Sequence, residues 1–225
     1  MTTQPGNHIL PHYDQALNNI QTRVLTISAT LLQHMEQLER AIASANQNEA
    51  NGIIAAHDSQ EEETRQILSL CAAVLTQFHP LGSDLRLIIS FSRCGDKLKE
   101  CADELLSLAR HAKNSIRQQT PLSPDILLPL LHMAAAEFRD AVECLKNKDS
   151  EAAGTIQVQD KKLDKAHRKA LALLVTPDGE QPPALNVHLL FMIRSIERIG
   201  DIAKSIAATV IFLKEARDIR HGKKK

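Results

Sequence analysis

Apolar residues recur at alternating steps of three and four along two long stretches of this 225-residue chain. The first stretch runs from Leu17 to Ile42 and the second from Leu189 to Leu213. This spacing gives a helix one apolar stripe, and the stripe is buried only when other helices pack against it. Short breaker segments divide the chain at residues 44–51, 79–83, 119–124, 147–150 and 176–183. The pattern predicts six helices joined by short loops and packed antiparallel.

Composition supports an all-α fold and excludes several other classes. Aromatic residues make up only 3% of the chain, and it has 8 Gly and 9 Pro, whereas β-sandwiches and barrels need β-favouring residues and many turns. The 27 Lys and Arg residues equal the 27 Asp and Glu residues. A balanced chain lacks the basic excess typical of nucleic-acid-binding proteins, so we expect no nucleic-acid partner.

The sequence favours a cytoplasmic protein. No apolar run approaches the roughly 18 residues that a membrane span requires, and the first ten residues lack the basic start and apolar core of a signal peptide. The four cysteines show no Cys-x-x-Cys spacing and lie among apolar residues, which indicates buried, reduced thiols rather than a disulfide framework or a zinc knuckle.

An internal repeat appears when the chain is compared with itself at a shift of about 100 residues. The shift matches Leu38 with Phe138 in the first helix of each half, and Asp103 with Asp201 in the third. In the second helix of each half it aligns the segments around residues 58 and 160. We therefore predict two pseudo-symmetric antiparallel three-helix bundles, over residues 1–120 and 121–225.

Two acidic pairs in the second half form the main candidate site. Asp160 and Asp164 lie four residues apart on one helix, and Glu197 and Asp201 repeat this spacing on the next. Because like charges at this spacing destabilise a helix, four clustered carboxylates favour a bound metal cation. Neighbouring bases such as Lys204 offer the alternative, a solvated salt-bridge face; spacing alone leaves both open and favours the salt bridges.

The matching positions of the first half are Asp58, Glu62 and Asp103, with Lys99 in the place of one acid. An ammonium group is not a metal ligand at neutral pH, so we expect this site to bind metal more weakly.

Two further interpretations of these residues compete with a non-enzymatic, metal-binding protein. His167 follows Asp164 by three residues, which resembles part of the ligand set of a di-iron carboxylate oxidase or metal-storage bundle; no second acid-x-x-His motif supports it. The last interpretation is a helical scaffold protein that binds no metal and whose acidic residues only keep it soluble.

The order of three segments on this six-helix repeat resembles the PhoU family of phosphate-signalling proteins. They are the Ser195-Ile-Glu-Arg-Ile-Gly-Asp201 string, the Asp160-Lys-Lys-Leu-Asp164 string, and the opening His79-Pro-x-x-x-Asp-Leu-Arg86. The resemblance covers residues 9–221.

The resemblance implies a fold of two three-helix bundles related by pseudo-two-fold symmetry, with acid-x-x-x-Asp motifs that bind multinuclear metal clusters at the bundle surface. Carried over by position, it implies a site for iron or zinc, as a divalent or trivalent ion. The residues implied are Asp160, Asp164, Glu197 and Asp201 in the second repeat, and Asp58, Glu62 and Asp103 in the first.

It also implies a cytoplasmic adaptor with no chemistry of its own. Members of the family regulate phosphate uptake and hold the phosphate response off when phosphate is plentiful. The partners it implies are a phosphate-specific ABC transporter, a membrane-bound sensor histidine kinase and a second copy of the chain, so that contact with the membrane is made only through partners.

Overall fold

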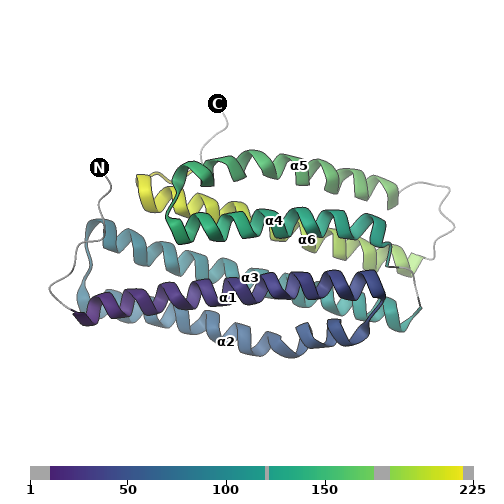
Figure 1. Cartoon of the computed structure of the whole chain (residues 1–225), viewed down its shortest axis with the longest axis horizontal. Coiled ribbons are helices and arrows are strands. Elements are labelled where there is room, and N and C mark those ends of the chain that lie inside the picture. Colours follow the sequence, from purple (N-terminus) through teal and green to yellow (C-terminus); the bar gives the residue numbers. More distant parts are fainter. Residues whose placement is uncertain (1–10, 120–121, 175–182, 220–225) are drawn as a thin grey trace.

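The computed structural model describes residues 11–119, 122–174 and 183–219, and within them it contains six α-helices and no strand (Figure 1). The helices are α1 (Pro11–Ser44), α2 (Gln47–Phe78), α3 (Gly82–Arg117), α4 (Pro124–Asn147), α5 (Ser150–Leu174) and α6 (Pro183–Glu215). The predicted all-α fold is confirmed. The first four predicted breakers each overlap an interhelical segment, although residues 47–51 of the first belong to α2. Residues 120–121 of the third breaker and 176–182 of the fifth lie outside the described residues. No helix of the described residues is long and apolar enough to cross a membrane.

Local sequence signals account for several helix ends. Asn46 caps α2, because its side chain accepts a hydrogen bond from the backbone N–H of Asn48. Pro124 occupies the first turn of α4, where its missing N–H leaves no helical bond unmade. Lys148 ends α4 in the left-handed conformation, and α5 begins two residues later. Such tight connections place successive helices side by side and antiparallel.

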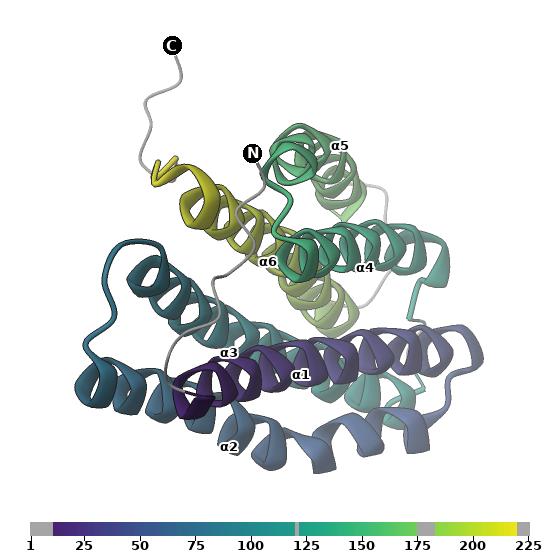
Figure 2. The ribbon, with the colours of Figure 1, turned by 60° about the vertical axis from the view of Figure 1, so that its left-hand side comes forward.

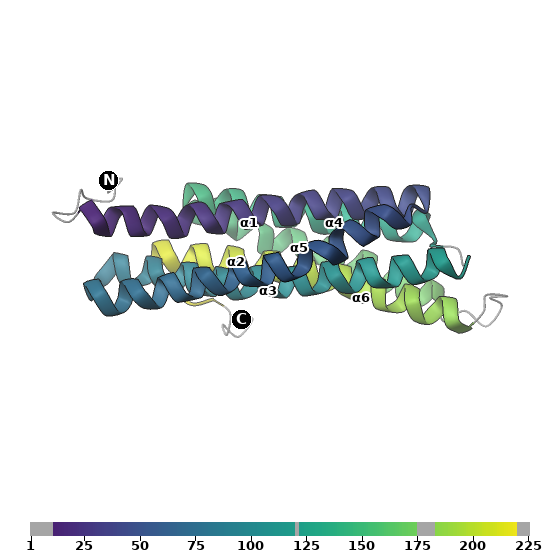
Figure 3. The ribbon, with the colours of Figure 1, turned by 90° about the horizontal axis from the view of Figure 1, so that it is seen from below.

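Four helices form the interior of the molecule and two lie at its periphery. Helices α1, α3, α4 and α6 make the contacts between the two halves, through the pairs α1 with α4 and α3 with α6. Among the described helices, α2 packs only on α1 and α3, and α5 only on α4 and α6 (Figure 2). All six run along the long axis of the molecule (Figure 3). Each outer helix therefore buries one side and leaves the other to solvent.

One continuous apolar core runs through both halves, with Phe138 as its largest fully buried side chain. The four cysteines, Cys71, Cys94, Cys101 and Cys144, are buried and free, as predicted. Burial raises the pKa of the Cys94 thiol to about 12, so this thiol stays protonated and packs as a small apolar group. Because the core is continuous, the division into domains at residue 120 stays a prediction.

The burial pattern corrects the repeat register in the outer helices. The buried residues Ala50, Ile53 and Ile67 of α2 correspond to the buried residues Ala153, Ile156 and Ala170 of α5, and each pair is separated by 103 positions. The predicted match of Asp58 with Asp160 uses a shift of 102 and is wrong by one residue. One residue turns a helix by about 100°, so the error moves a side chain from the buried side to the solvent side.

Gly200 allows α5 and α6 to approach each other closely. A Cβ atom at this position would lie 2.3 Å from a terminal methyl carbon of Leu163, which is itself 1% exposed. We expect Gly200→Ala to lower the free energy of unfolding by about 1 to 3 kcal/mol, the usual effect of overpacking. Gly154→Ala is the matched control on α5, since its Cβ would meet no atom within 4 Å; it should stabilise the protein by up to about 1 kcal/mol. Urea unfolding measures both, and equal effects would contradict the close approach.

Candidate metal centre

Helices α5 and α6 bring Asp160 and Asp201 to one lysine. Lys204 Nζ lies 2.5 Å from Asp160 Oδ2 and 3.1 Å from Asp201 Oδ1. Asp160 is only 4% exposed, whereas the side chain of Asp201 is 40% exposed. Burial lowers the pKa of Lys204, but its hydrogen bonds to the two carboxylates outweigh burial and raise it. Lys204 is therefore a cation that links the two acids.

Glu197 and Asp164 lie one helical turn from Asp201 and Asp160, on the same two helices. Glu197 Oε2 is 3.6 Å from His167 Nε2, and these residues line a depression of about 520 Å³ together with Asp164, Lys161 and Arg168. The His167 Nε2 atom is buried and has no hydrogen-bond partner, because 3.6 Å is too long for such a bond. The depression therefore offers one unused imidazole nitrogen beside two carboxylates.

A fifth carboxylate, Glu137 of α4, was missed by the sequence analysis. Its side chain is buried, and its Oε2 atom lies next to Gly200 and accepts no hydrogen bond. Burial and, secondarily, the charge of Asp160 raise the pKa of Glu137 to about 7. A glutamate directly before Phe138, inside the apolar stripe of its helix, was the sequence signal that could have revealed it.

The chemistry of this cluster fits a hard or borderline metal ion. Lys204 bonds Asp160 and Asp201. Glu137 lies near enough to Asp160, Lys204 and Asp164 to feel their charges, and Glu197 lies beside His167. Among the described residues, the buried atoms Glu137 Oε2 and His167 Nε2 have no hydrogen-bond partner. Oxygen and imidazole ligands suit iron and zinc. Within the described residues, no three His, Cys, Asp or Glu side chains converge closely enough to hold an ion as they stand. Lys204 lies between Asp160 and Asp201, so binding at both acids requires its ammonium group to move.

The corresponding cluster of the first half has a different composition. His57 Nε2 and Lys99 Nζ each lie 2.9 Å from Asp103, and Lys99 also lies 3.7 Å from Glu61. Burial raises the pKa of Asp103, but the hydrogen bonds from Lys99 and His57 outweigh it and lower this pKa. The nitrogen groups of His57 and Lys99 thus already pair with the carboxylates. This cluster therefore fits a metal ion less well than the cluster of the second half does.

Asp58 and Glu62 do not face α3. The side chain of Asp58 is fully exposed, and Glu62 binds Arg65 and Gln66 on its own helix. The residues that reach α3 are their chain neighbours His57 and Glu61. Of the predicted first-repeat residues, the structure places only Asp103 in the cluster.

The raised pKa of Glu137 predicts a pH-dependent stability in metal-free protein. The folded chain keeps this proton up to about pH 7, whereas the unfolded chain releases it near pH 4.5. The folded state binds more protons in that window, so the free energy of unfolding falls as the pH rises through it. Glu137→Gln imitates the neutral acid and should be more stable than the parent protein at about pH 8, by about 1 to 2 kcal/mol.

Urea unfolding at about pH 4.5 and about pH 8, in the presence of a chelator, measures this difference. Glu143→Gln provides the matched control, because Glu143 is exposed on the same helix. A Glu137→Gln effect of equal size at both pH values would contradict the assignment.

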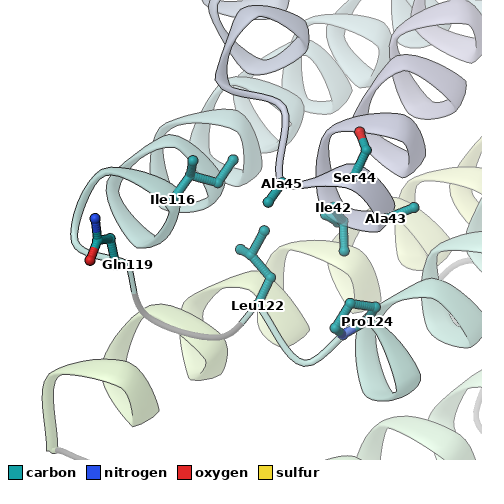
Figure 4. Close-up of a pocket in the computed structure, with 8 residues that line it drawn as sticks. All are labelled: Ile42, Ala43, Ser44, Ala45, Ile116, Gln119, Leu122 and Pro124. Carbon is teal, nitrogen blue, oxygen red and sulfur yellow. The ribbon is translucent and has the colours of Figure 1, made fainter.

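A separate pocket of about 560 Å³ lies where α1 ends and α4 begins (Figure 4). Apolar side chains such as Ile42, Ile116 and Leu122 line it, and Gln119 and Ser44 are its polar residues. None of the lining residues carries a charge, so this pocket suits neither a metal ion nor phosphate.

Comparison with known proteins identifies relatives along the whole chain. Residues 127–210 match the family model described as PhoU domain. The chain is 28% identical over 220 residues to the phosphate-specific transport system accessory protein PhoU homolog of Pseudomonas aeruginosa, covering 96% of this chain and 90% of that protein. It is 25% identical over 219 residues to the phosphate-specific transport system accessory protein PhoU of Escherichia coli, with the same coverage of each.

Solved structures show the same fold. The crystal structure of PhoU from Pseudomonas aeruginosa superposes with a TM-score of 0.86 at 26% identity, over 91% of this chain and 100% of that one. The crystal structure of the phosphate transport system regulatory protein PhoU from Streptococcus pneumoniae superposes with a TM-score of 0.84 at 18% identity. The match covers 92% of this chain and 99% of that one. The predicted six-helix, all-α fold is confirmed, and it matches these solved PhoU structures.

Proposed function

Because the chain carries a PhoU domain at residues 127–210 and resembles PhoU proteins over 96% of its length, we propose that it is an accessory regulator of a phosphate-specific transport system. In this role it binds metal at the α5–α6 cluster and carries out no chemistry of its own. The relatives are named accessory proteins of a phosphate-specific transport system, which supports a role beside such a transporter.

One observation carries the metal-binding part of the proposal. Carboxylates from α4, α5 and α6 gather around Lys204, the cation that bonds Asp160 and Asp201, and Glu137 Oε2 is left buried without a partner. Asp160, Asp164, Glu197 and Asp201 would hold iron or zinc, singly or as a multinuclear cluster. When bound, the metal supplies positive charge that neutralises the carboxylates. Since two of these residues lie on α5 and two on α6, their shared binding of a metal would fix how α5 lies against α6.

The shape of the molecule supports an adaptor role. Long helices with extended solvent-facing sides present surfaces to protein partners. We propose that the partners are the phosphate-specific ABC transporter and a sensor histidine kinase, that the protein acts in the cytoplasm and forms a homodimer, and that it restrains the phosphate response when phosphate is plentiful.

The exposure of the acids supports this role over a di-iron oxidase or storage bundle. Such bundles hold their ligands in the interior, whereas the side chains of Glu197 and Asp201 are 32% and 40% exposed. Oxygen consumption after addition of ferrous iron separates the two. We expect no consumption above that of a protein-free control, and rapid consumption that depends on Glu197 would establish the enzyme instead.

Deletion in the host tests the regulatory role. Loss of the gene should raise expression of phosphate-starvation genes at high phosphate, and the intact gene should restore repression. A strain that carries Glu197→Ala and Asp201→Ala tests whether the metal centre is needed for this repression. Unchanged expression after deletion, at both high and low phosphate, would overturn the proposed function.

A further inference from the structure

From Val158 to Leu173 the solvent side of α5 carries five cations and no carboxylate, and the exposed Glu151 lies two turns before Val158. Eight exposed residues at helical spacing form this side, which we call the α5 outer face. They are Val158, Lys161, Lys162, Lys165, Arg168, Lys169, Ala172 and Leu173. Within the described residues none of the five cations forms an ion pair with a carboxylate; Arg168 bonds only the backbone oxygen of Asp164. A chain of zero net charge thus concentrates five cations on residues 158–173 of one helix side, which carries a charge of +4 when Glu151 is included.

The repeat provides an internal comparison. With the 103-residue shift set by burial, the α5 outer face corresponds to Ala55, Asp58, Ser59, Glu62, Arg65, Gln66, Ser69 and Leu70 on α2. Those positions hold two acids and one base, a charge of −1, and Arg65 pairs with Glu62. A solvated outer helix of this fold therefore does not need five unpaired cations. The basic face belongs to the second repeat alone.

Large apolar side chains stand at both ends of the basic face. Val158 is 63% exposed and Leu173 is 54% exposed, and both lie in the same helical arc as the lysines. Near the end of α5, the first turns of α6 expose Val187 and Leu190 as well. Cations in a row between exposed aliphatic side chains are the pattern of a helix that lies on a membrane surface.

We propose that the α5 outer face binds directly to the surface of an anionic phospholipid bilayer. In the bound state α5 lies along the headgroup layer, its lysines and Arg168 contact lipid phosphates, and Val158 and Leu173 enter the boundary with the acyl chains. This contact adds to contact through protein partners. It goes beyond the proposed function, since it requires neither phosphate nor a bound metal.

The aliphatic side chains favour a bilayer over other anionic partners. A nucleic-acid backbone could satisfy the cations but offers no apolar region for Val158 and Leu173. An acidic protein would need apolar pockets at both ends of the basic helix, whereas a bilayer offers its acyl boundary along the whole length. The lysines also keep long aliphatic stems that can lie along the interface. Helix α5 packs on α4 and α6 only, so no helix of the described residues covers this face.

Vesicle sedimentation of the full chain tests the proposal. Vesicles of phosphatidylcholine mixed with phosphatidylglycerol are compared with vesicles of phosphatidylcholine alone, at low salt and with a chelator that prevents bridging by metal ions. We expect binding only to the anionic vesicles, and loss of binding at about 1 M salt, where charges are screened within about 3 Å.

The decisive variant is Lys162→Gln, Lys165→Gln and Lys169→Gln combined. None of these lysines lines the depression beside the metal centre, and binding to anionic vesicles should fall more than about tenfold. The control removes the same charge from exposed positions on three other helices, by combining Arg110→Gln, Lys146→Gln and Lys214→Gln, and should bind as the parent does. Val158→Ser should weaken binding without removing its salt dependence.

Three results would overturn the proposal. They are no binding of the parent to anionic vesicles at low salt, equal binding of the two triple variants, and binding to duplex DNA with no binding to vesicles. The last would assign the basic face to a polyanion instead. Because a chelator is present throughout, none of these results bears on the metal centre.

Discussion

The double variant Glu197→Ala, Asp201→Ala is expected to lose the bound metal. The two acids lie one turn apart on α6, and Asp201 shares Lys204 with the buried Asp160. After both are removed, Lys204 alone neutralises Asp160, and no carboxylate of α6 remains from the predicted set. Metal content after purification with iron or zinc should fall by more than about tenfold, since loss of a ligand removes both charge and coordination.

The control for this variant is Asp58→Ala combined with Glu62→Ala, which removes the same charge at the same spacing from the exposed side of α2. Both proteins should keep the helical circular dichroism of the parent. Equal metal content in the α6 double variant and the parent would refute the site. A loss confined to the α2 variant would move the metal to the first repeat and contradict the register set by burial.

Phe138→Ala is expected to produce the largest loss of stability among the single substitutions considered. Phe138 is 0% exposed and lies on α4, which packs on α1, α5 and α6. Replacing a buried phenylalanine by alanine removes its transfer free energy and leaves a cavity, which together cost about 3 to 5 kcal/mol. Because α4 touches both halves through α1 and α6, the loss should appear in one cooperative transition.

Phe191→Ala is the matched control, with the same change at a side chain 45% exposed. Phe191 stacks on His111 of α3, with ring centroids 5.1 Å apart, so we expect a smaller loss of about 1 kcal/mol. Chemical denaturation monitored by circular dichroism compares the two proteins. A loss at Phe138 no greater than that at Phe191 would contradict the placement of Phe138 in the core.

Helix positions were predictable because they depend on local periodicity and breakers. The stripe from Leu17 to Ile42 lies along α1 and the stripe from Leu189 to Leu213 along α6, and both stripes are buried. The register between repeats was less secure, because a shift of 102 aligns Asp58 with Asp160 and Glu62 with Asp164, whereas a shift of 103 aligns only Glu61 with Asp164 in this stretch. Only the buried sides of α2 and α5 distinguish the two.

The site was predictable in part for a similar reason. Spacing placed Asp160 and Asp164 on one helix face, and Glu197 and Asp201 on the next. Which cations reach these acids depends on how the helices are rotated against each other. From the sequence, the pairing of Lys204 with both Asp160 and Asp201 was therefore one of several possibilities. Glu137 lies on a third helix, and its burial next to Gly200 depends on the close approach of α5 to α6.

The sequence by itself determined that this chain forms six amphipathic helices in two related sets, because an apolar period of 3.6 residues and short polar breakers act within each segment. Only the tertiary structure decided which residue of each acidic stretch faces inward, that His57 rather than Asp58 meets Asp103, and that the five cations of α5 share one uncovered face. The physical reason is the 100° turn per residue: one step of register exchanges a buried carboxylate for a solvated one, and helix packing sets that register.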